Sequence, residues 1–253
     1  MNARGLLIDL DGTLYTEDGP ISGAREALSC LEEAGISYRY VTNTTRKPRR
    51  EVVSRLRELG FSARDDLVFT PAIAANALLQ DLRCHALVPE KLLEDLADVD
   101  LSGSEAPEYV LVGDLGHGFN YARLNEGFRH LMEGAGLVAL QRNRFWQEAD
   151  GLSLDAGPFV MALEYASGKT ATVVGKPESA FFEAALRDLK LDAKDVAMVG
   201  DDTETDVAGA RKAGLLGVQV QTGKYHSGDR MGTTGEPDAA IESIARLPEI
   251  LGV

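Results

Sequence analysis

Short, uninterrupted apolar runs alternate with segments of helical periodicity along most of this chain, and this alternation constrains the fold more than any other feature. Helical spacing is clear at 22–34 and 179–189, for example. Strands and helices in alternation predict a parallel sheet with helical crossovers, and runs without polar interruption are typical of strands covered on both faces. We therefore expect an α/β fold with a Rossmann-like parallel sheet. Its strand-like runs are 5–9, 37–42, 67–69, 171–174, 196–199 and 216–220.

One long interval breaks this alternation. About 130 residues separate the run at 37–42 from the run at 171–174, whereas a single crossover needs roughly 30. The interval contains strand-like runs and helical patterns of its own. We predict that residues 1–74 and 169–253 form a core domain, and that 75–168 form a second α/β unit inserted into it.

Polar residues directly follow four of the apolar runs. In an open parallel sheet, ligands bind beyond the carboxyl ends of the strands, so these residues should converge on one small volume. Leu10 should point into the packing, because neighbouring strand residues alternate in direction. The four segments are Asp9-Leu10-Asp11-Gly12-Thr13, Thr42-Asn43-Thr44-Thr45, Gly175-Lys176-Pro177 and Gly200-Asp201-Asp202, with Asp206 further on.

These residue types together favour phosphate chemistry. Clustered aspartates require a cation to remain ionised, and oxygen-only ligands favour Mg²⁺, which also binds phosphate oxygens. Lys176 can neutralise the phosphoryl oxygens, and Thr42 and Asn43 can donate hydrogen bonds to them. One carboxylate facing a phosphorus atom can act as a nucleophile, and a second, two residues on, as general acid and then base.

Each pattern taken alone also has a simpler explanation. The two aspartates at 9 and 11 could be turn residues that cap a helix, and "TNTT" could be an ordinary helix N-cap. "GKP" could place an exposed lysine before a proline at the first position of a helix. "GDDTET" could be a capped helix start with Glu204 in its first turn. The joint occurrence at successive strand ends is what favours a catalytic site.

The four segments resemble the motifs of the haloacid dehalogenase-like hydrolase superfamily. "DLDGTL" resembles its first motif, "VTNTT" its second, "VVGKPES" its third and "MVGDDTETDV" its fourth. The insertion between the second and third motifs is similar to the α/β cap of the type II subfamily. Within it, "VGDLGHGFNYARLNEGF" and "DGLSLDAGPFVMALEYASG", and after it "QTGKY", are similar to the 4-nitrophenyl-phosphatase-like branch, type IIA with a C2 cap.

The resemblance implies a role for each residue. Asp9 would be the nucleophile and a Mg²⁺ ligand, and Asp11 would be the general acid/base and bind Mg²⁺ through its carbonyl. Lys176 would neutralise the transferring phosphate. Thr42 and Asn43 would hold that phosphate, Asp201 would ligate Mg²⁺, and Asp206 and Asp202 would lie in the shell around the metal, Asp202 alternatively as a helix cap.

Asp11 and the insertion refine this interpretation. Some members of the branch resemble this chain but carry serine where it has Asp11, and serine cannot act as a general acid at neutral pH. Asp11 therefore indicates cleavage of phosphomonoesters and argues against dehalogenation. A cap can exclude water and select substrates, and we predict that its Asp155, Gly157 and Pro158 contact the substrate. An ordinary helix start with Pro158 at its first position is the alternative.

Composition excludes several classes of partner and site. The chain has 253 residues and a formal net charge of −14, which argues against nucleic acid and anionic membranes as partners. The N-terminal sequence does not fit a signal peptide, and Cys30 and Cys84 are typical of reduced thiols, so we expect a cytoplasmic protein. The histidines show no ligand spacing, and we assign no chemistry to His85, His117, His130 or His226.

The leading hypothesis is a Mg²⁺-dependent phosphatase for a small phosphorylated metabolite, working through an aspartyl-phosphate. A phosphotransferase or mutase and a catalytically silent phosphate-binding protein are alternatives on the same fold. A signalling receiver domain also uses Asp, Mg²⁺, Thr and Lys, but such domains need only about half this length and carry no large insertion. The identity of the substrate and the existence of a homodimer are left open by the sequence.

Overall fold

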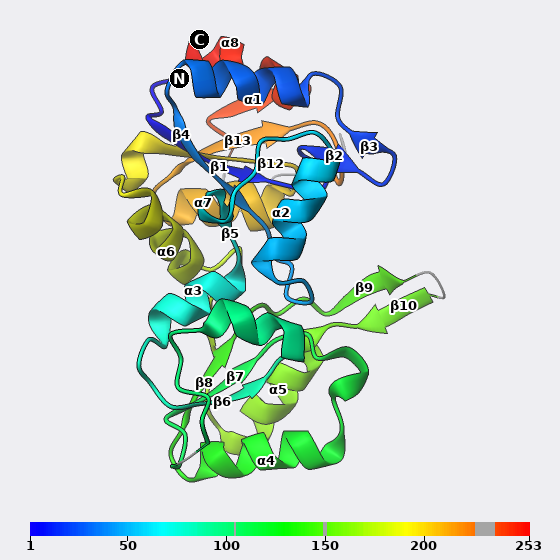
Figure 1. Cartoon of the computed structure of the whole chain (residues 1–253), viewed down its shortest axis with the longest axis vertical. Coiled ribbons are helices and arrows are strands. Elements are labelled where there is room, and N and C mark those ends of the chain that lie inside the picture. The colour runs from blue at the N-terminus through cyan, green and yellow to red at the C-terminus, as the bar shows by residue number, and fades with distance from the viewer. Residues whose placement is uncertain (104, 149–150, 226–235) are drawn as a thin grey trace. The chain divides into compact units, whose positions relative to one another are not determined.

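The described part of the chain forms two compact units. A computed structural model describes residues 1–103, 105–148, 151–225 and 236–253 (Figure 1). The first unit comprises Met1–Thr42, Arg50–Phe69 and Lys176–Val253, and the second comprises Asn43–Arg49 and Thr70–Gly175. The predicted insertion, 75–168, falls inside Thr70–Gly175. His226 lies outside the described residues.

The first unit is built on a six-stranded parallel sheet, which confirms the predicted α/β class. The strand order is β14-β13-β12-β1-β4-β5, and every neighbouring pair is parallel. All residues of the two central strands, β1 and β12, are buried, as expected for strands covered on both faces. The strands are β1 (Gly5–Asp9), β4 (Ser37–Val41), β5 (Val68–Phe69), β12 (Val196–Gly200), β13 (Leu216–Val220) and β14 (Ala239–Ile241).

Helices cover both faces of this sheet. Leu6 and Ile8 of β1 belong to one hydrophobic core with the apolar faces of α1, α2 and α8, whereas Leu7 between them points away from it. In Figure 1, α6 and α7 lie on the side of the sheet opposite α1 and α8. The helices are α1 (Ala24–Glu33), α2 (Arg49–Glu58), α6 (Ser179–Leu189), α7 (Gly209–Lys212) and α8 (Leu247–Leu251), and a hairpin pairs β2 (Tyr15–Thr16) with β3 (Gly19–Pro20).

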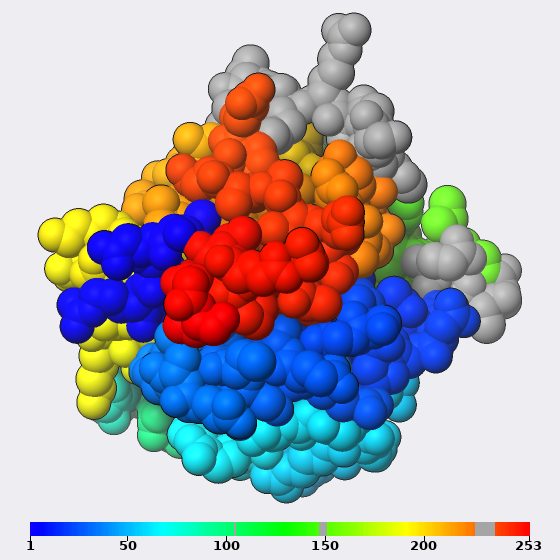
Figure 2. Space-filling model, turned by 90° about the horizontal axis from the view of Figure 1, so that it is seen from above, coloured from blue at the N-terminus to red at the C-terminus, as the bar shows by residue number. Residues whose placement is uncertain are grey.

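Both termini lie in this first unit. Figure 2 shows the last residues, in red, against the N-terminal residues, in blue. The Met1 amino group donates a hydrogen bond to the Ile250 carbonyl oxygen, so the two ends of the chain are in contact. Among the described helices, none has the length and apolar character needed to cross a membrane.

The second unit has a smaller parallel sheet in the order β11-β8-β7-β6. Its core lies between this sheet and helices α4 and α5, around Val110, Val112, Leu131, Val160 and Leu163. The strands are β6 (Cys84–Leu87), β7 (Tyr109–Val112), β8 (Gly136–Ala139) and β11 (Thr172–Val173). A separate hairpin pairs β9 (Phe145–Glu148) with β10 (Gly151–Leu154), and the helices are α3 (Pro71–Leu78), α4 (Tyr121–Met132) and α5 (Ala156–Ser167).

The assignment of the apolar run at 171–174 to the core sheet was wrong. Its strand, β11, pairs with β8 of the second unit, with Thr172 opposite Val138 and Val173 opposite Ala139. Apolar character alone cannot tell which of two sheets a buried strand joins, because both sheets offer the same environment. Lys176 therefore does not follow a strand of the core sheet, although it is the first residue of the chain's return to the first unit.

Candidate active site

The carboxyl edge of the central strands brings together residues from three parts of the sequence. The register places Asp9 of β1 opposite Val41 of β4, and Ile8 opposite Val199 of β12. Thr42 follows Val41 directly, and Asp201 follows the last residue of β12. Asp9, Thr42 and Asp201 are all buried at this edge, with exposed fractions of 7%, 5% and 2%. Leu10, next to Asp9, is buried in the hydrophobic core, as the alternation of strand side chains predicted.

Lys176 links two of the buried aspartates. Its Nζ donates to Asp9 Oδ1 at 2.5 Å and to Asp206 Oδ1 at 2.6 Å. All three residues are almost completely enclosed, so water screens these charges little and the ion pairs are strong. The lysine therefore holds the Asp9 carboxylate in one orientation and leaves its other oxygen for a ligand or a reacting atom.

Asp201 lies against the backbone of two glycine turns. Gly12, with φ of +83°, is so close that a Cβ on it would lie 2.1 Å from Asp201 Oδ2, and Gly223, with φ of +62°, would meet the same oxygen at 2.1 Å. The Lys224 backbone N–H donates to this oxygen at 2.7 Å. The glycine of "DLDG" is therefore required twice, by its left-handed conformation and by the approach of this carboxylate.

Asp206 and Asp202 occupy the turn that follows β12. Asp202 caps the short π-helix Thr203–Ala208, because its Oδ1 accepts hydrogen bonds from the backbone N–H groups of Glu204 at 3.0 Å and Thr205 at 2.9 Å. Asp206 Oδ2 accepts from the Asp202 backbone N–H at 3.2 Å. Both oxygens of Asp206 are thus engaged, one by Lys176 and one by the turn.

Burial shifts the ionisation of this cluster. It raises the pKa of Asp201 to about 6, against the hydrogen bond from the Lys224 backbone, and raises the pKa of Asp206 to about 7, against the attraction of Lys176. Burial also raises the pKa of Asp9, again opposed by Lys176. For Lys176 itself, burial lowers the pKa, but Asp206 and Asp9 outweigh it and raise the pKa overall. Lys176 therefore stays charged, and its single positive charge does not balance the negative charge of all three aspartates.

The residues present fit a divalent cation. One carboxylate oxygen from each of Asp9, Asp201 and Asp206 lies within 4.8 Å of the others. Three carboxylates meet one buried ammonium group among the residues that the structure describes, so two negative charges are left to balance. Oxygen donors with this excess of charge are typical of Mg²⁺ sites.

Asp11 differs from the other aspartates in being exposed to solvent. The Gly12 N–H donates to the Tyr15 carbonyl at 2.7 Å, which closes the turn after Asp11. Burial, together with the charges of Asp11 and Asp9 and a hydrogen bond with the Asp11 side chain, raises the pKa of the Tyr15 hydroxyl, so it stays protonated. A solvent-exposed carboxylate that is held by a hydroxyl group can exchange protons with a reacting group and with water.

The remaining predicted residues belong to the second unit. Asn43 is its first residue. Asp155 is buried and caps α5, accepting from the Ala156 N–H at 2.7 Å and from the Gln141 side chain. A Cβ on Gly157 would lie 2.5 Å from the Asn143 carbonyl oxygen, and Pro158 lies in the first turn of α5. The interactions of Asp155 and Gly157 are thus of the kind that fix a helix start.

Three residues that brace the site were missed by the sequence analysis. Gln219 of β13 donates from Nε2 to the Asp201 carbonyl at 2.8 Å, and Thr222 donates to the Gly12 carbonyl at 2.5 Å. Tyr15 holds Asp11. A buried glutamine inside an apolar strand was the available signal for Gln219, but its partners at the site, the Gly200 and Asp201 carbonyls, lie on another strand end, so the sequence could not identify them.

Comparisons with known proteins agree with the motifs. Residues 6–102 match the family described as haloacid dehalogenase-like hydrolase, and residues 173–247 match the family described as HAD-hydrolase-like. Together these ranges contain the segments that carry Asp9, Asp11, Lys176 and Asp201.

Similar proteins cover nearly the whole chain. Haloacid dehalogenase-like hydrolase domain-containing protein 2 from Homo sapiens is 41% identical, over 95% of this chain and 92% of that protein. Phospholysine phosphohistidine inorganic pyrophosphate phosphatase from Danio rerio is 40% identical, over 96% and 92%. Among solved structures, a p-nitrophenyl phosphatase from Archaeoglobus fulgidus superimposes with a TM-score of 0.90 at 28% identity, covering 99% of this chain and 100% of that chain.

Proposed function

Because the chain belongs to the haloacid dehalogenase-like hydrolase family, we propose that it is a phosphatase that hydrolyses a small phosphorylated metabolite through an aspartyl-phosphate on Asp9. Two of the similar proteins, the one from Danio rerio and the one from Archaeoglobus fulgidus, are named as phosphatases. The net charge of −14 means that local positive charge must attract an anionic substrate. Lys176 and a bound cation would supply it.

The observation that carries this proposal is the contact of Lys176 Nζ with Asp9 Oδ1 at 2.5 Å, inside a buried cluster of acids. A nucleophilic carboxylate must be ionised and must be oriented by its surroundings. Burial raises the pKa of Asp9, and Lys176 opposes this effect. The same ammonium group can neutralise a phosphoryl oxygen when substrate binds, so one side chain supports both the nucleophile and the transferred group.

In the first half of the reaction, a carboxylate oxygen of Asp9 attacks phosphorus. The bond from phosphorus to the leaving oxygen breaks, and Asp11 donates a proton to that oxygen, which leaves as an alcohol. Thr42 and Asn43 would hold the phosphoryl oxygens through hydrogen bonds. The exposed position of Asp11 allows it to reach a leaving group that extends from the site.

In the second half, water attacks the phosphorus of the aspartyl-phosphate. Asp11, now a carboxylate, takes the proton of the water, the acyl-phosphate bond breaks, and inorganic phosphate leaves. Asp9 regains its carboxylate and Asp11 its proton. The Tyr15 hydroxyl, which stays protonated, would stabilise the charged form of Asp11 between the two halves.

Asp9, Asp201 and the carbonyl of Asp11 would hold Mg²⁺, which would draw negative charge away from the phosphoryl oxygens when bound. Asp206 would act from the surrounding shell, since Lys176 and the Asp202 N–H already occupy its oxygens. Asp202 would support the same turn as its cap.

We also propose a role for each of the two units. The first unit would form the phosphatase core, and the second unit, which contains the predicted insertion 75–168, the C2-type cap. Asp155, Gly157 and Pro158 would contact the substrate. A cytoplasmic location agrees with the unpaired Cys30 and Cys84. A homodimer stays an open alternative.

The test compares hydrolysis of 4-nitrophenyl phosphate with hydrolysis of a phosphorylated alkyl alcohol. Asp9→Asn and removal of divalent cations by EDTA should each lower kcat by at least about 1,000-fold on both substrates. Asp11→Asn should lower kcat on the alkyl ester by about 100-fold or more but spare 4-nitrophenyl phosphate, because nitrophenolate leaves without a proton.

Asp65→Asn is the matched control, since Asp65 is an exposed aspartate in the same unit and should leave kcat unchanged. Turnover that survives Asp9→Asn would contradict the aspartyl-phosphate. Equal losses on both substrates in Asp11→Asn would make that residue structural. Transfer of phosphate to an added alcohol in preference to water would favour the phosphotransferase alternative, and binding of phosphate without turnover would favour the silent protein.

A further inference from the structure

The second unit contains a cluster of potential metal ligands, which we call the histidine cluster: His85, Glu126 and His130. One ligand atom from each of the three side chains lies within 4.8 Å of the other two. His85 is far from Glu126 and His130 in the sequence, which is why the spacing of the histidines alone indicated no chemistry. All three belong to one compact unit, so their geometry does not depend on the first unit.

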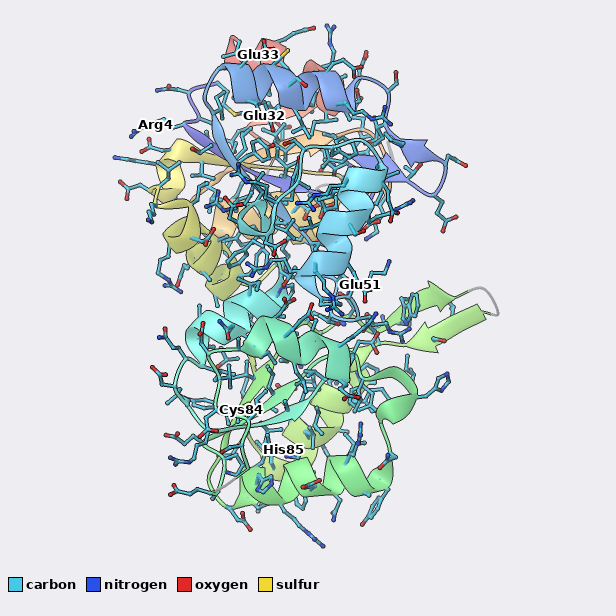
Figure 3. The ribbon with its side chains drawn as sticks, viewed as in Figure 1. Arg4, Glu32, Glu33, Glu51, Cys84 and His85 are labelled. Atoms are coloured by element: carbon cyan, nitrogen blue, oxygen red, sulfur yellow. The ribbon has the colours of Figure 1, made fainter. Side chains whose placement is uncertain are left out.

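The fold builds this cluster from one strand and one helix. His85 lies on β6 beside the buried Cys84 (Figure 3). Glu126 and His130 are four residues apart on α4, so they lie on the same face of that helix. Between them, a Cβ on Gly127 would lie 3.2 Å from Leu87 Cδ1 and 3.4 Å from Val110 Cγ1. This glycine therefore lets α4 approach β6 and β7 closely. The ring centroids of His85 and His130 are 5.0 Å apart.

Two of the ring nitrogens are buried without compensation. Within the described residues, neither His85 Nε2 nor His130 Nδ1 has a hydrogen-bond partner, although both atoms are shielded from solvent. The Glu133 carboxylate oxygen lies 3.6 Å from His130 Nδ1, beyond hydrogen-bond distance. Buried polar atoms are usually paired, and an ion is one of the explanations for those that are not.

The cluster opens onto a cavity. A cavity of about 410 Å³ is lined by all three residues, together with Cys84, Asp100 and others. A metal held by three protein side chains would therefore keep a coordination position that water or a small ligand can reach. Closed structural zinc sites have four protein ligands, whereas sites with three ligands and an open position are typical of reactive or exchangeable ions.

We propose that His85, Glu126 and His130 form a binding site for a divalent transition-metal ion of the Zn²⁺ class, separate from the cluster around Asp9. Two imidazoles and a carboxylate are donors that suit Zn²⁺, Co²⁺, Ni²⁺ or Cu²⁺, whereas Mg²⁺ prefers oxygen alone. Ligands of a tetrahedral Zn²⁺ lie roughly 3.4 Å apart with bonds of about 2.1 Å. In the structure the ligand atoms lie within 4.8 Å of one another. Rotation of the solvent-exposed Glu126 side chain and a small shift of the two imidazole rings would bring them to the distances that a metal requires.

The ionisation of His85 agrees with this site. Burial lowers the pKa of His85, and the neighbouring His130 lowers it further, against the attraction of Glu126. The ring is therefore neutral near pH 7, which is the form that binds metals.

The test uses the full chain, stripped of metal with EDTA and then dialysed against Co²⁺ in a large excess of Mg²⁺, which occupies oxygen-only sites. The wild type should retain one equivalent of Co²⁺ with the visible absorption of a four-coordinate ion, and Zn²⁺ should displace it. His85→Ala and His130→Ala should each weaken Co²⁺ binding by at least about 100-fold, and Glu126→Gln by about 10-fold.

His117→Ala is the matched control, because His117 lies in the same unit but outside the cluster, and it should retain Co²⁺ fully. A second readout needs no variant: Zn²⁺ should shift the imidazole NMR signals of His85 and His130 and leave that of His117 in place. Failure of the wild type to retain Co²⁺ above the excess Mg²⁺, or equal retention by His85→Ala and wild type, would overturn the proposal and leave a packed histidine pair. Because phosphatase activity is not a readout, this failure is distinct from failure of the proposed function.

Discussion

The two clusters of potential metal ligands in this chain are built in contrasting ways. The aspartate cluster, formed by Asp9, Asp201 and Asp206, is buried, offers only oxygen and contains its own countercharge in Lys176. The histidine cluster is partly exposed, offers two nitrogens and one oxygen, and carries a single formal negative charge on Glu126. The difference lies in how much of the charge the protein compensates by itself.

This difference follows from the cost of burying charge. Buried carboxylates are strongly destabilised without a partner, so the chain must supply one whether or not a cation is bound. Neutral imidazoles cost much less to bury, so the histidine cluster can persist without an ion at the expense of two unpaired nitrogens. We therefore expect single substitutions in the aspartate cluster to change the stability of the fold strongly, and single substitutions in the histidine cluster to change it little.

The largest expected effect comes from Lys176→Met. Loss of the ammonium group removes the partner of both Asp9 and Asp206, and kcat/KM should fall by about 1,000-fold or more. The free energy of unfolding without metal should fall by about 3 kcal/mol at pH 8, as for other broken buried ion pairs. Activity assays and urea unfolding measure the two effects.

Lys194→Met, at an exposed lysine of the same unit, should change neither quantity. Co²⁺ retention by the histidine cluster should also be unaffected by Lys176→Met. Loss of Co²⁺ retention in Lys176→Met would show that the two clusters are coupled, and would contradict their separate construction.

A pair of glycine substitutions gives a smaller effect and sharpens the comparison. Gly12→Ala should destabilise the fold by at least about 2 kcal/mol and abolish activity, because φ is +83° and the new Cβ would lie 2.1 Å from Asp201 Oδ2. Gly127→Ala should change stability by less than about 1 kcal/mol, since its helical backbone accepts alanine and the nearest atoms are flexible side-chain ends at 3.2 and 3.4 Å.

Urea unfolding of both variants measures this difference. Gly127→Ala should keep full phosphatase activity while weakening Co²⁺ binding, because α4 must move slightly away from β6. Equal destabilisation by the two substitutions would show that close backbone approach matters as much in the second unit as in the first.

The last expected effect is confined to a narrow pH range and is a change in the pH dependence of stability in Asp201→Asn. The pKa of Asp201 is about 6 in the folded protein and 3.8 when unperturbed, so between these pH values the folded chain keeps a proton that the unfolded chain has lost. Its contribution to the free energy of unfolding therefore falls as pH rises from about 4 to about 6, by roughly 3 kcal/mol. Asparagine does not titrate, so the Asp201→Asn variant does not lose stability in this way as pH rises.

Denaturant unfolding in EDTA at several pH values tests the sign. Asp201→Asn should gain stability relative to the wild type as pH rises, and saturating Mg²⁺ should reduce that gain by favouring the charged aspartate. Parallel stability profiles in EDTA would contradict the burial of Asp201 as the source of its raised pKa.

Much of the fold was predictable because the local signals agree with the tertiary structure. The runs around 5–9, 37–42, 196–199 and 216–220 became strands of one parallel sheet, as their composition predicts. The run at 171–174 did not join it, because β11 pairs with β8 of the second unit. The choice between two equally apolar sheets depends on the path of the whole chain.

The candidate site divides in the same way. Asp9, Lys176, Asp201 and Asp206 were identifiable from their positions after apolar runs and from the family motifs. Gln219, Thr222 and Tyr15 were not, because their importance rests on hydrogen bonds to residues that are distant in the sequence or to a turn that forms only in the fold. The histidine cluster could not be predicted for the same reason, since His85 of β6 comes near Glu126 and His130 only when α4 packs against the sheet.

The sequence by itself determined the fold class and the chemical type of the site, because periodic burial and the clustering of acids after strands are local properties. Only the tertiary structure decided which carboxylates Lys176 contacts, why Gly12 cannot carry a side chain, and that two histidines lie near one carboxylate. Those features depend on distances between segments that are remote along the chain. Such distances are set by the packing of sheets and helices as a whole.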